Sequence, residues 1–242
     1  MNKKTYVIRP LGETGLIVTF GDQISPQIHK RIKNLADYIE KHPFPGFYEY
    51  VISYTSVAVF YNPFVIKNNG IATADKTAYR TVLEIIETYI AAAAKLPQTT
   101  PHTVEIPVCY GDDYGPDIDF VAKHNKLSIN EVIEIHSQKT YLVYMIGFCP
   151  GFPYLGGMDT RIATPRRAEP RLSIPAGSIG IAGKQTGGYP ISTPGGWQLI
   201  GRTPIDLFRP ESLNPSLLHS GDLVKFVPIT SEKYQQLKEN NP

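Results

Sequence analysis

Residues 147–204 read GFCPGFPYLGGMDTRIATPRRAEPRLSIPAGSIGIAGKQTGGYPISTPGGWQLIGRTP, and this stretch holds twelve of the chain's twenty glycines and eight of its 21 prolines. Glycine lets the backbone adopt positive φ or approach another group closely, whereas proline fixes φ. Short β-like runs separated by such residues favour a compact barrel or sandwich. Basic residues outnumber acidic ones here by six to two, so we also expect the stretch to be cationic.

The carboxyl-terminal part, including this stretch, contains four predicted strands and two short helices. Predicted strands cover residues 141–146, 177–182, 197–201 and 223–227. One helix is predicted over residues 116–123. A second begins at Ser128, because Ser128 and Glu131 have the spacing of a capping box. We therefore predict a compact β-barrel or β-sandwich domain over residues 101–242.

The first hundred residues follow a different pattern. Predicted strands cover residues 6–8, 16–20, 47–52 and 56–61, and the last two are expected to form a hairpin. Ser25 and Pro26 are suited to the N-cap and first position of a helix whose apolar face is Ile28, Ile32, Leu35 and Ile39. A second helix is predicted over about 74–95, and Pro97 ends it.

The order of these elements indicates a fold for the amino-terminal domain. Two strands, a helix, two strands and a helix are followed by a strand at 103–108, which leads into the carboxyl-terminal domain. This order resembles a ferredoxin-like α/β sandwich with one extra strand, over residues 1–100. The polar string 98–102 marks the expected boundary. The predicted fold class is therefore α+β.

Composition excludes several classes of function. The chain has 242 residues, a net charge of +2, 42% hydrophobic residues and two cysteines. The charge is too small to indicate nucleic-acid binding, and the cysteines form neither a disulfide framework nor a zinc motif. We find no secretory signal and no apolar run long enough to cross a membrane. We expect a soluble, cytoplasmic protein that binds no metal, nucleic acid or membrane.

Single motifs in the glycine-rich stretch leave alternatives open. Residues 180–186 look like a phosphate loop, but Ser178 and Gln185 break the Walker pattern, which leaves an anion-binding hairpin or an ordinary one. Arg166, Arg167 and Arg171 suit bidentate recognition of a carboxylate or phosphate, or they form a solvated basic edge. Cys149 with His136 upstream is a weak nucleophile candidate, because nothing nearby indicates a lowered thiol pKa.

Taken together, the motifs resemble one known family. They are His136-Ser137, the run 141–148, PGFPYLGG at 150–157, ATPRR at 163–167, PAGSIGIAG at 175–183, QTG at 185–187, Tyr189-Pro190, PGGW at 194–197 and GRTP at 201–204, with RPLG at 9–12 near the amino terminus. In this order they resemble the family of the 5-oxoprolinase B subunit (PxpB), also called KipI or allophanate hydrolase subunit 1. The resemblance covers nearly the whole chain.

The resemblance implies a fold, partners and a reaction. It implies a ferredoxin-like amino-terminal domain and a cyclophilin-like β-barrel. It also implies two partners, the 5-oxoprolinase C subunit and an amidohydrolase-like A subunit. Together the three proteins open 5-oxo-L-proline to L-glutamate with hydrolysis of ATP. Gly188 departs from the family pattern. Cys149 lies at a position where the family accepts several residue types.

Opening a lactam requires activation of its carbonyl oxygen, and cations and N–H donors stabilise the charge that develops there. On this basis we assign candidate roles to two sets of residues. The candidate catalytic residues are Arg166, Arg167, Lys184, Gln185 and Arg202. The candidate substrate-binding residues are Phe152, Tyr154, Thr186, Tyr189, Gly195, Gly196, Trp197 and His136.

Two other functions fit the same resemblance. A KipI-like chain inhibits the autophosphorylation of a sensor histidine kinase, which would then be the partner. A carboxyltransferase-type chain is related to the paired domains of urea carboxylase. The sequence does not separate these functions from an oxoprolinase role.

Overall fold

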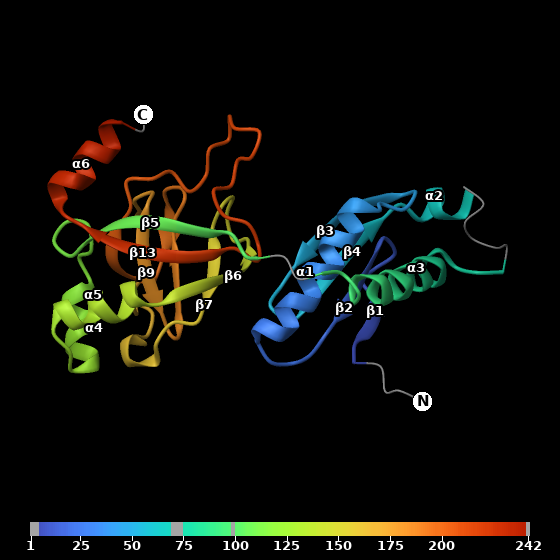
Figure 1. Cartoon of the computed structure of the whole chain (residues 1–242), viewed down its shortest axis with the longest axis horizontal. Coiled ribbons are helices and arrows are strands. Elements are labelled where there is room, and N and C mark those ends of the chain that lie inside the picture. Colours follow the sequence, from blue (N-terminus) through green and yellow to red (C-terminus); the bar gives the residue numbers. More distant parts are fainter. Residues whose placement is uncertain (1–4, 69–74, 98–99, 241–242) are drawn as a thin grey trace. The chain divides into compact units, whose positions relative to one another are not determined.

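The computed structural model describes residues 5–68, 75–97 and 100–240. The chain divides into two units, Met1–Thr100 and Pro101–Pro242 (Figure 1), and each unit has a hydrophobic core of its own. Of the predicted boundary string, Gln98 and Thr99 lie outside the described residues, as does the predicted start of the second helix at Ala74.

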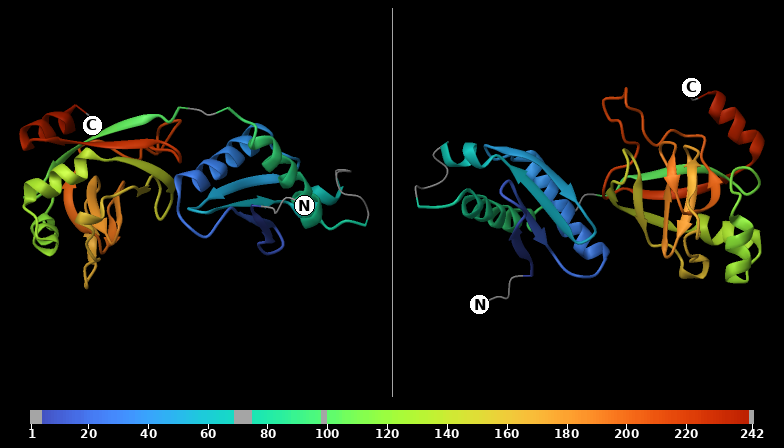
Figure 2. Two further views of the ribbon diagram at one scale, coloured as in Figure 1. Left: turned by 60° about the horizontal axis from the view of Figure 1, so that its bottom comes forward. Right: turned by 180° about the vertical axis from the view of Figure 1, so that it is seen from behind.

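The first unit is a four-stranded sheet with helices on one face. Its elements are β1 (Val7–Pro10), β2 (Gly15–Thr19), α1 (Pro26–Lys41), β3 (Phe47–Ile52), β4 (Ser56–Tyr61), α2 (Pro63–Asn68) and α3 (Ala78–Ala93). The sheet order is β1-β2-β4-β3, and each pair is antiparallel. Helices α1 and α3 pack against each other and against the strands, so both cover the same face of the sheet (Figure 2).

Local signals explain helix α1. The Ser25 hydroxyl accepts a hydrogen bond from the Ile28 N–H, and Pro26 occupies the first turn. Ile32, Leu35 and Ile39 are fully or almost fully buried against the sheet. The predicted cap and apolar face are confirmed.

The predicted strand at 103–108 does not join this sheet. It forms part of β5 (Thr103–Tyr110), which pairs with strands of the second unit. The sequence analysis counted this strand in the ferredoxin-like order and also placed it at the entry to the second domain, and the pairing shows that it belongs to the second unit. The sheet pairing depends on partners distant in the sequence, which local periodicity does not specify. The ferredoxin-like identification stays a prediction.

The second unit contains a closed barrel of seven strands in the order β10-β7-β6-β13-β5-β12-β9. Its strands are β5, β6 (Thr140–Ile146), β7 (Pro153–Gly156), β9 (Ser178–Ala182), β10 (Gln185–Gly188), β12 (Gln198–Arg202) and β13 (Leu223–Ile229). Strands β5 and β13 are parallel. The predicted β-barrel is confirmed, and four of the predicted strand runs correspond to β6, β9, β12 and β13.

Helices and a small ribbon complete the second unit. They are α4 (Ile118–Asn125), α5 (Ile129–Gln138), the short helix η1 (Thr160–Ile162) and α6 (Ser231–Glu239), with a two-stranded ribbon of β8 (Arg171–Ile174) and β11 (Thr193–Gly195). The capping box of Ser128 and Glu131 is present at the start of α5. Sequence analysis missed α6.

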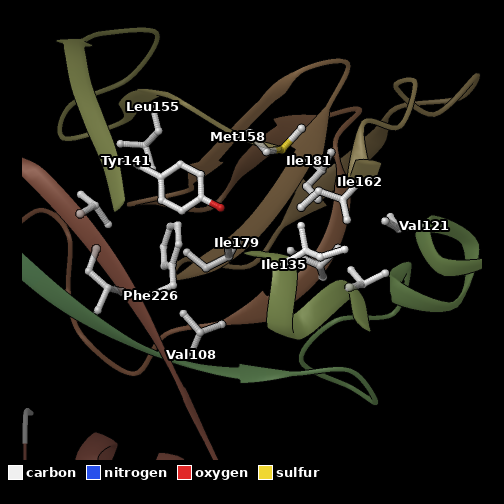
Figure 3. Packing of buried hydrophobic residues seen from close by; sticks show 14 of the residues in the cluster. Val108, Val121, Ile135, Tyr141, Leu155, Met158, Ile162, Ile179, Ile181 and Phe226 are labelled. Carbon is white, nitrogen blue, oxygen red and sulfur yellow. The ribbon is translucent and has the colours of Figure 1, made fainter. Parts of the chain in front are cut away.

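Aliphatic and aromatic side chains fill the barrel. Tyr141 and Phe226 pack with their ring centroids 5.3 Å apart, beside Ile179 (Figure 3). Ile179 and Ile181 alternate along β9 and belong to this interior core. The side chains between them therefore point to the outside of the barrel. No described helix is both long and apolar enough to span a lipid bilayer.

Candidate functional site

An aromatic cluster lies on the outside of strands β9, β10 and β12. Phe152 contacts Tyr189 and Trp197 edge to face, with ring centroids 5.4 and 5.6 Å apart. Tyr154 contacts Phe152 at 5.2 Å. Ile174 of β8 is buried in the same cluster, which places the β8–β11 ribbon against it. The structure thus brings four predicted substrate-binding residues together, but Phe152, Tyr189 and Trp197 are almost fully buried.

Glycines allow this close packing. A Cβ at Gly195 would lie 2.7 Å from both the Tyr189 hydroxyl and Ile174 Cδ1, and one at Gly187 would lie 3.2 Å from the rings of Phe152 and Trp197. Gly196 has more room, and its carbonyl accepts a hydrogen bond from the Arg167 N–H at 2.8 Å. Gly188 is also closely packed, because a Cβ there would lie 2.8 Å from Leu207 Cδ1.

Asp117 holds two of the arginines. Its Oδ1 accepts hydrogen bonds from Arg167 Nη1 at 3.1 Å and Arg171 Nη2 at 2.8 Å. Its Oδ2 accepts one from the Leu199 N–H at 2.7 Å. The carboxylate is only 7% exposed, so these bonds act in a partly desolvated setting where they are stronger than at the surface. Arg167 and Arg171 are therefore oriented, partly neutralised cations.

Sequence analysis missed Asp117. The residue directly precedes α4, where an acidic side chain usually caps the helix, yet its side chain makes no capping bond. Its partners are 50, 54 and 82 residues away. The sequence offered one signal for Asp117: it is an acidic residue in a chain whose later segment has an excess of basic residues that need partners.

The other predicted cations lie at two different ends of the barrel strands. Lys184 is exposed at the β9–β10 turn, and an isolated β-bridge between Thr164 and Gly183 places the exposed Arg166 on the neighbouring segment. Gln185 is the first residue of β10. Arg202 pairs with Ser178, at the far end of β9 from this turn, and its Nε donates to the Ala176 carbonyl at 2.8 Å. The structure does not bring Arg202 to Lys184.

The hairpin of residues 180–186 lacks the form of a phosphate loop. The Gly183 N–H donates to the Thr164 carbonyl at 2.7 Å, so this amide is not available to an anion. Residues 185–188 continue as a strand paired with β9 rather than as a helix. The segment is therefore an ordinary β-hairpin of the barrel with an exposed lysine.

His136 and Thr186 lie inside the unit and are fully buried. The Thr186 hydroxyl donates to the Gly180 carbonyl at 3.0 Å and therefore accepts from His136 Nε2 at 2.9 Å. His136 Nδ1 then accepts from the Tyr110 hydroxyl at 2.8 Å. Burial lowers the pKa of His136 to about 3, so its ring is neutral. Neither residue is part of the candidate surface, because both side chains are fully buried.

Two ionisable groups near the aromatic cluster are neutral at pH 7. Burial raises the pKa of Tyr189 to about 12, although the Trp197 backbone and Arg166 favour its charged form. Burial also raises the pKa of the half-buried Cys149 thiol. A nucleophilic cysteine requires the opposite shift, which agrees with giving Cys149 no catalytic role.

The candidate surface is therefore a cationic border beside packed aromatic rings. Arg167 and Arg171 share Asp117, and Arg167 also bonds to Gly196. Arg166 and Lys184 lie on the two segments that the Thr164–Gly183 bridge joins. Guanidinium groups fixed by a carboxylate suit planar anions and developing oxyanions.

Comparisons with known proteins identify the family. A family model described as carboxyltransferase domain, subdomain C and D, matches residues 6–218. The chain belongs to this family. The 5-oxoprolinase B subunit of Bacillus subtilis (strain 168) is 49% identical over 98% of this chain and 98% of that protein. The resemblance to the B subunits of 5-oxoprolinase is thereby confirmed.

Solved structures of relatives share the fold. A conserved uncharacterized protein from Pyrococcus horikoshii is 45% identical, with a TM-score of 0.54 over 94% of this chain and 100% of that one. The urea carboxylase of Kluyveromyces lactis has a TM-score of 0.72 over 100% of this chain and 24% of that one. Its identity of 22% shows a common fold alone.

Proposed function

We propose that this chain is the B subunit of an ATP-dependent 5-oxoprolinase. The observation that carries the proposal is the 49% identity, over nearly the full length of both chains, to the B. subtilis protein named as the B subunit of 5-oxoprolinase. The name of that relative implies further subunits in a complex. On this proposal the chain acts with the A and C subunits and has no turnover alone.

In the proposed reaction, the ring C–N bond of 5-oxo-L-proline breaks with the addition of water, which gives L-glutamate. A lactam is a stable amide, so the step depends on stabilising negative charge that develops on the carbonyl oxygen. Arg166, Arg167 and Lys184 are the proposed cations for that charge or for the substrate carboxylate. Arg167 is the best oriented of these, because Asp117 fixes its Nη1.

ATP hydrolysis by the assembled enzyme would drive ring opening. Residues 180–186 do not fit a nucleotide site, since the Gly183 amide is already bonded to Thr164 and no helix follows. We therefore propose no nucleotide-binding role for this hairpin.

Reconstitution tests the proposal. The purified chain is mixed with the A and C subunits, ATP and 5-oxo-L-proline, and glutamate release is measured. We expect release only when all three proteins and ATP are present. Equal release by the two partners without this chain, or no release by the complete mixture, would contradict the proposal.

A matched pair of variants tests the cationic surface. Arg167→Ala is expected to lower glutamate release by the complete mixture at least tenfold, since one oriented donor to a developing oxyanion contributes about 10²-fold or more. Arg161→Ala is the control, because Arg161 is 63% exposed and pairs with Asp159 rather than with Asp117. Full activity of Arg167→Ala would remove Arg167 from the site and leave the proposed role of the chain intact.

Carboxyl transfer is a second candidate function, favoured by the family's description as a carboxyltransferase domain. It predicts that the chain, together with a partner protein, accelerates loss of the carboxyl group from carboxybiotin on a carrier protein. Unchanged carboxybiotin lifetime would eliminate this candidate.

A further inference from the structure

The sheet of the first unit has a second face, opposite helices α1 and α3. Side chains alternate between the two faces of a strand, and Leu16, Val18, Val57 and Val59 point toward the helices, where they are fully buried. The residues between them point the other way. The apolar ones on this second face are Val7, Ile17, Val51, Ala58 and Phe60.

The strand register places these residues next to one another. Ile17 pairs with Ala58, which pairs in turn with Val51 on β3. Phe60 pairs with Gly15, and its ring lies 3.1 Å from where a Gly15 Cβ would be, so it covers that glycine. Val7 and Val51 are each 50% exposed. Ile17, Ala58 and Val51 therefore form an apolar row across three strands with Phe60 in the next row, and Val7 lies at the edge beside Thr19. This apolar strip remains partly open to solvent.

A positive and a negative side chain flank the apolar strip, one on each edge strand of the sheet. Arg9 on β1 pairs with Ile17 and shares its face, and Glu49 on β3 pairs with Phe60 and shares its face. Among the described residues, neither side chain has an ion-pair or hydrogen-bond partner. Two unpaired opposite charges on either side of an apolar strip form a self-complementary pattern.

We propose that this face binds the same face of a second copy of the chain. A twofold axis in the interface and parallel to the strands places β1 of one copy opposite β3 of the other, as an isologous dimer requires. Stacked sheets lie about 10 Å apart, and aligned sheets cross at about 30°. Arg9 is in line with Val51 across the sheet, whereas Glu49 lies one pair of residues farther along the strands. The long arginine side chain can span this offset. Each dimer then contains two Arg9–Glu49 pairs around the buried strip.

The size of the face predicts a weak dimer. Four strands about 4.8 Å apart, with about five residues of 3.4 Å each, give a face of roughly 300 Å². A standard stable interface covers about 800 Å² on each partner. We therefore expect reversible association in the micromolar range or weaker, and low salt should strengthen it because the pairs lie at its border.

Charge reversal tests the proposal with the full-length chain. Sedimentation velocity from about 5 to 500 μM at low salt should show a monomer–dimer equilibrium for the unaltered chain. Arg9→Glu and Glu49→Arg should each weaken association at least tenfold, because each places like charges opposite one another. The double variant should restore association to within about threefold. Lys30→Glu, on the exposed side of α1, makes the same change of charge elsewhere and should have no effect.

Two results would overturn the proposal. One is a chain that stays monomeric over the whole concentration range. The other is a double variant that associates no better than the single ones, because an interface that does not pair Arg9 with Glu49 gains nothing from the exchange. Circular dichroism of each variant confirms that the fold is retained, so loss of association is not mistaken for unfolding.

Discussion

At the scale of single residues, Asp117 connects segments that the sequence keeps far apart. Its carboxylate joins the 163–171 segment, through Arg167 and Arg171, to the backbone of β12 at Leu199. Within the described residues, Arg171 Nη1 is buried without a hydrogen-bond partner. Loss of the Asp117 charge would therefore leave two cations close together, one of them poorly hydrated.

Removing that charge should destabilise the second unit. We expect Asp117→Asn to lower its free energy of unfolding by about 3 kcal/mol, since breaking a buried ion pair leaves uncompensated charge. Urea unfolding measures the loss. Asp119→Asn, two residues on and exposed, is the control and should change stability by less than about 0.5 kcal/mol. Equal stability of the two variants would mean that Asp117 does not compensate the arginines.

His136 makes stability depend on pH. Its folded pKa of about 3 lies below the ordinary value of 6.5, so the unfolded chain binds the proton first as pH falls. The contribution of His136 is complete above pH 6.5 and decreases by up to about 1.4 kcal/mol per pH unit toward pH 3. The chain should therefore unfold in less urea at pH 5 than at pH 7.

Substitution isolates this titration. His136→Gln should reduce the slope of unfolding free energy against pH between about 6 and 4, whatever its absolute stability. His124→Gln, at an exposed position, should keep the slope of the unaltered chain. An unchanged slope in the His136 variant would show that other groups cause the acid sensitivity.

At the scale of elements, the β8–β11 ribbon rests on the aromatic cluster through adjacent glycines with different surroundings. A Cβ at Gly195 meets Tyr189 and Ile174 at 2.7 Å, whereas one at Gly196 meets nothing closer than 3.6 Å. Gly195→Ala should therefore destabilise the second unit by about 1–3 kcal/mol, as overpacking does. Gly196→Ala should be nearly neutral. Thermal unfolding compares the two variants, and equal melting temperatures would mean that the ribbon adjusts without cost.

The elements also show what the sequence can predict. Helix α1 and the capping box of α5 were predicted because their signals lie within a few residues: Ser25 before Pro26, and Ser128 before Glu131. The neighbours of β5 in the barrel were not predicted, since its pairing with β13 joins residues more than 100 positions apart.

The candidate site follows the same rule. The cationic segment and the aromatic residues were recognised from composition and motif. Three features were not predicted, because they depend on long-range pairing: the role of Asp117, the burial of His136 and the separation of Arg202 from Lys184.

At the scale of the whole molecule, the two units have separate cores. Leu16, Ile32 and Val59 belong to one, and Ile106, Val224 and others belong to the second. A domain with its own core can unfold on its own, because few of its apolar contacts depend on the rest of the chain.

A substitution in one core should therefore leave the other unit intact. Ile32 is fully buried, so Ile32→Ala should lower the free energy of unfolding of the first unit by about 2–5 kcal/mol through the cavity it creates. Native-state hydrogen exchange should show reduced protection in β2 and β4 and unchanged protection in β5 and β13. Val224→Ala, also fully buried, should give the reverse pattern. If either variant reduced protection equally in both units, the two cores would belong to one cooperative structure, because separate domains do not share the cost of a cavity.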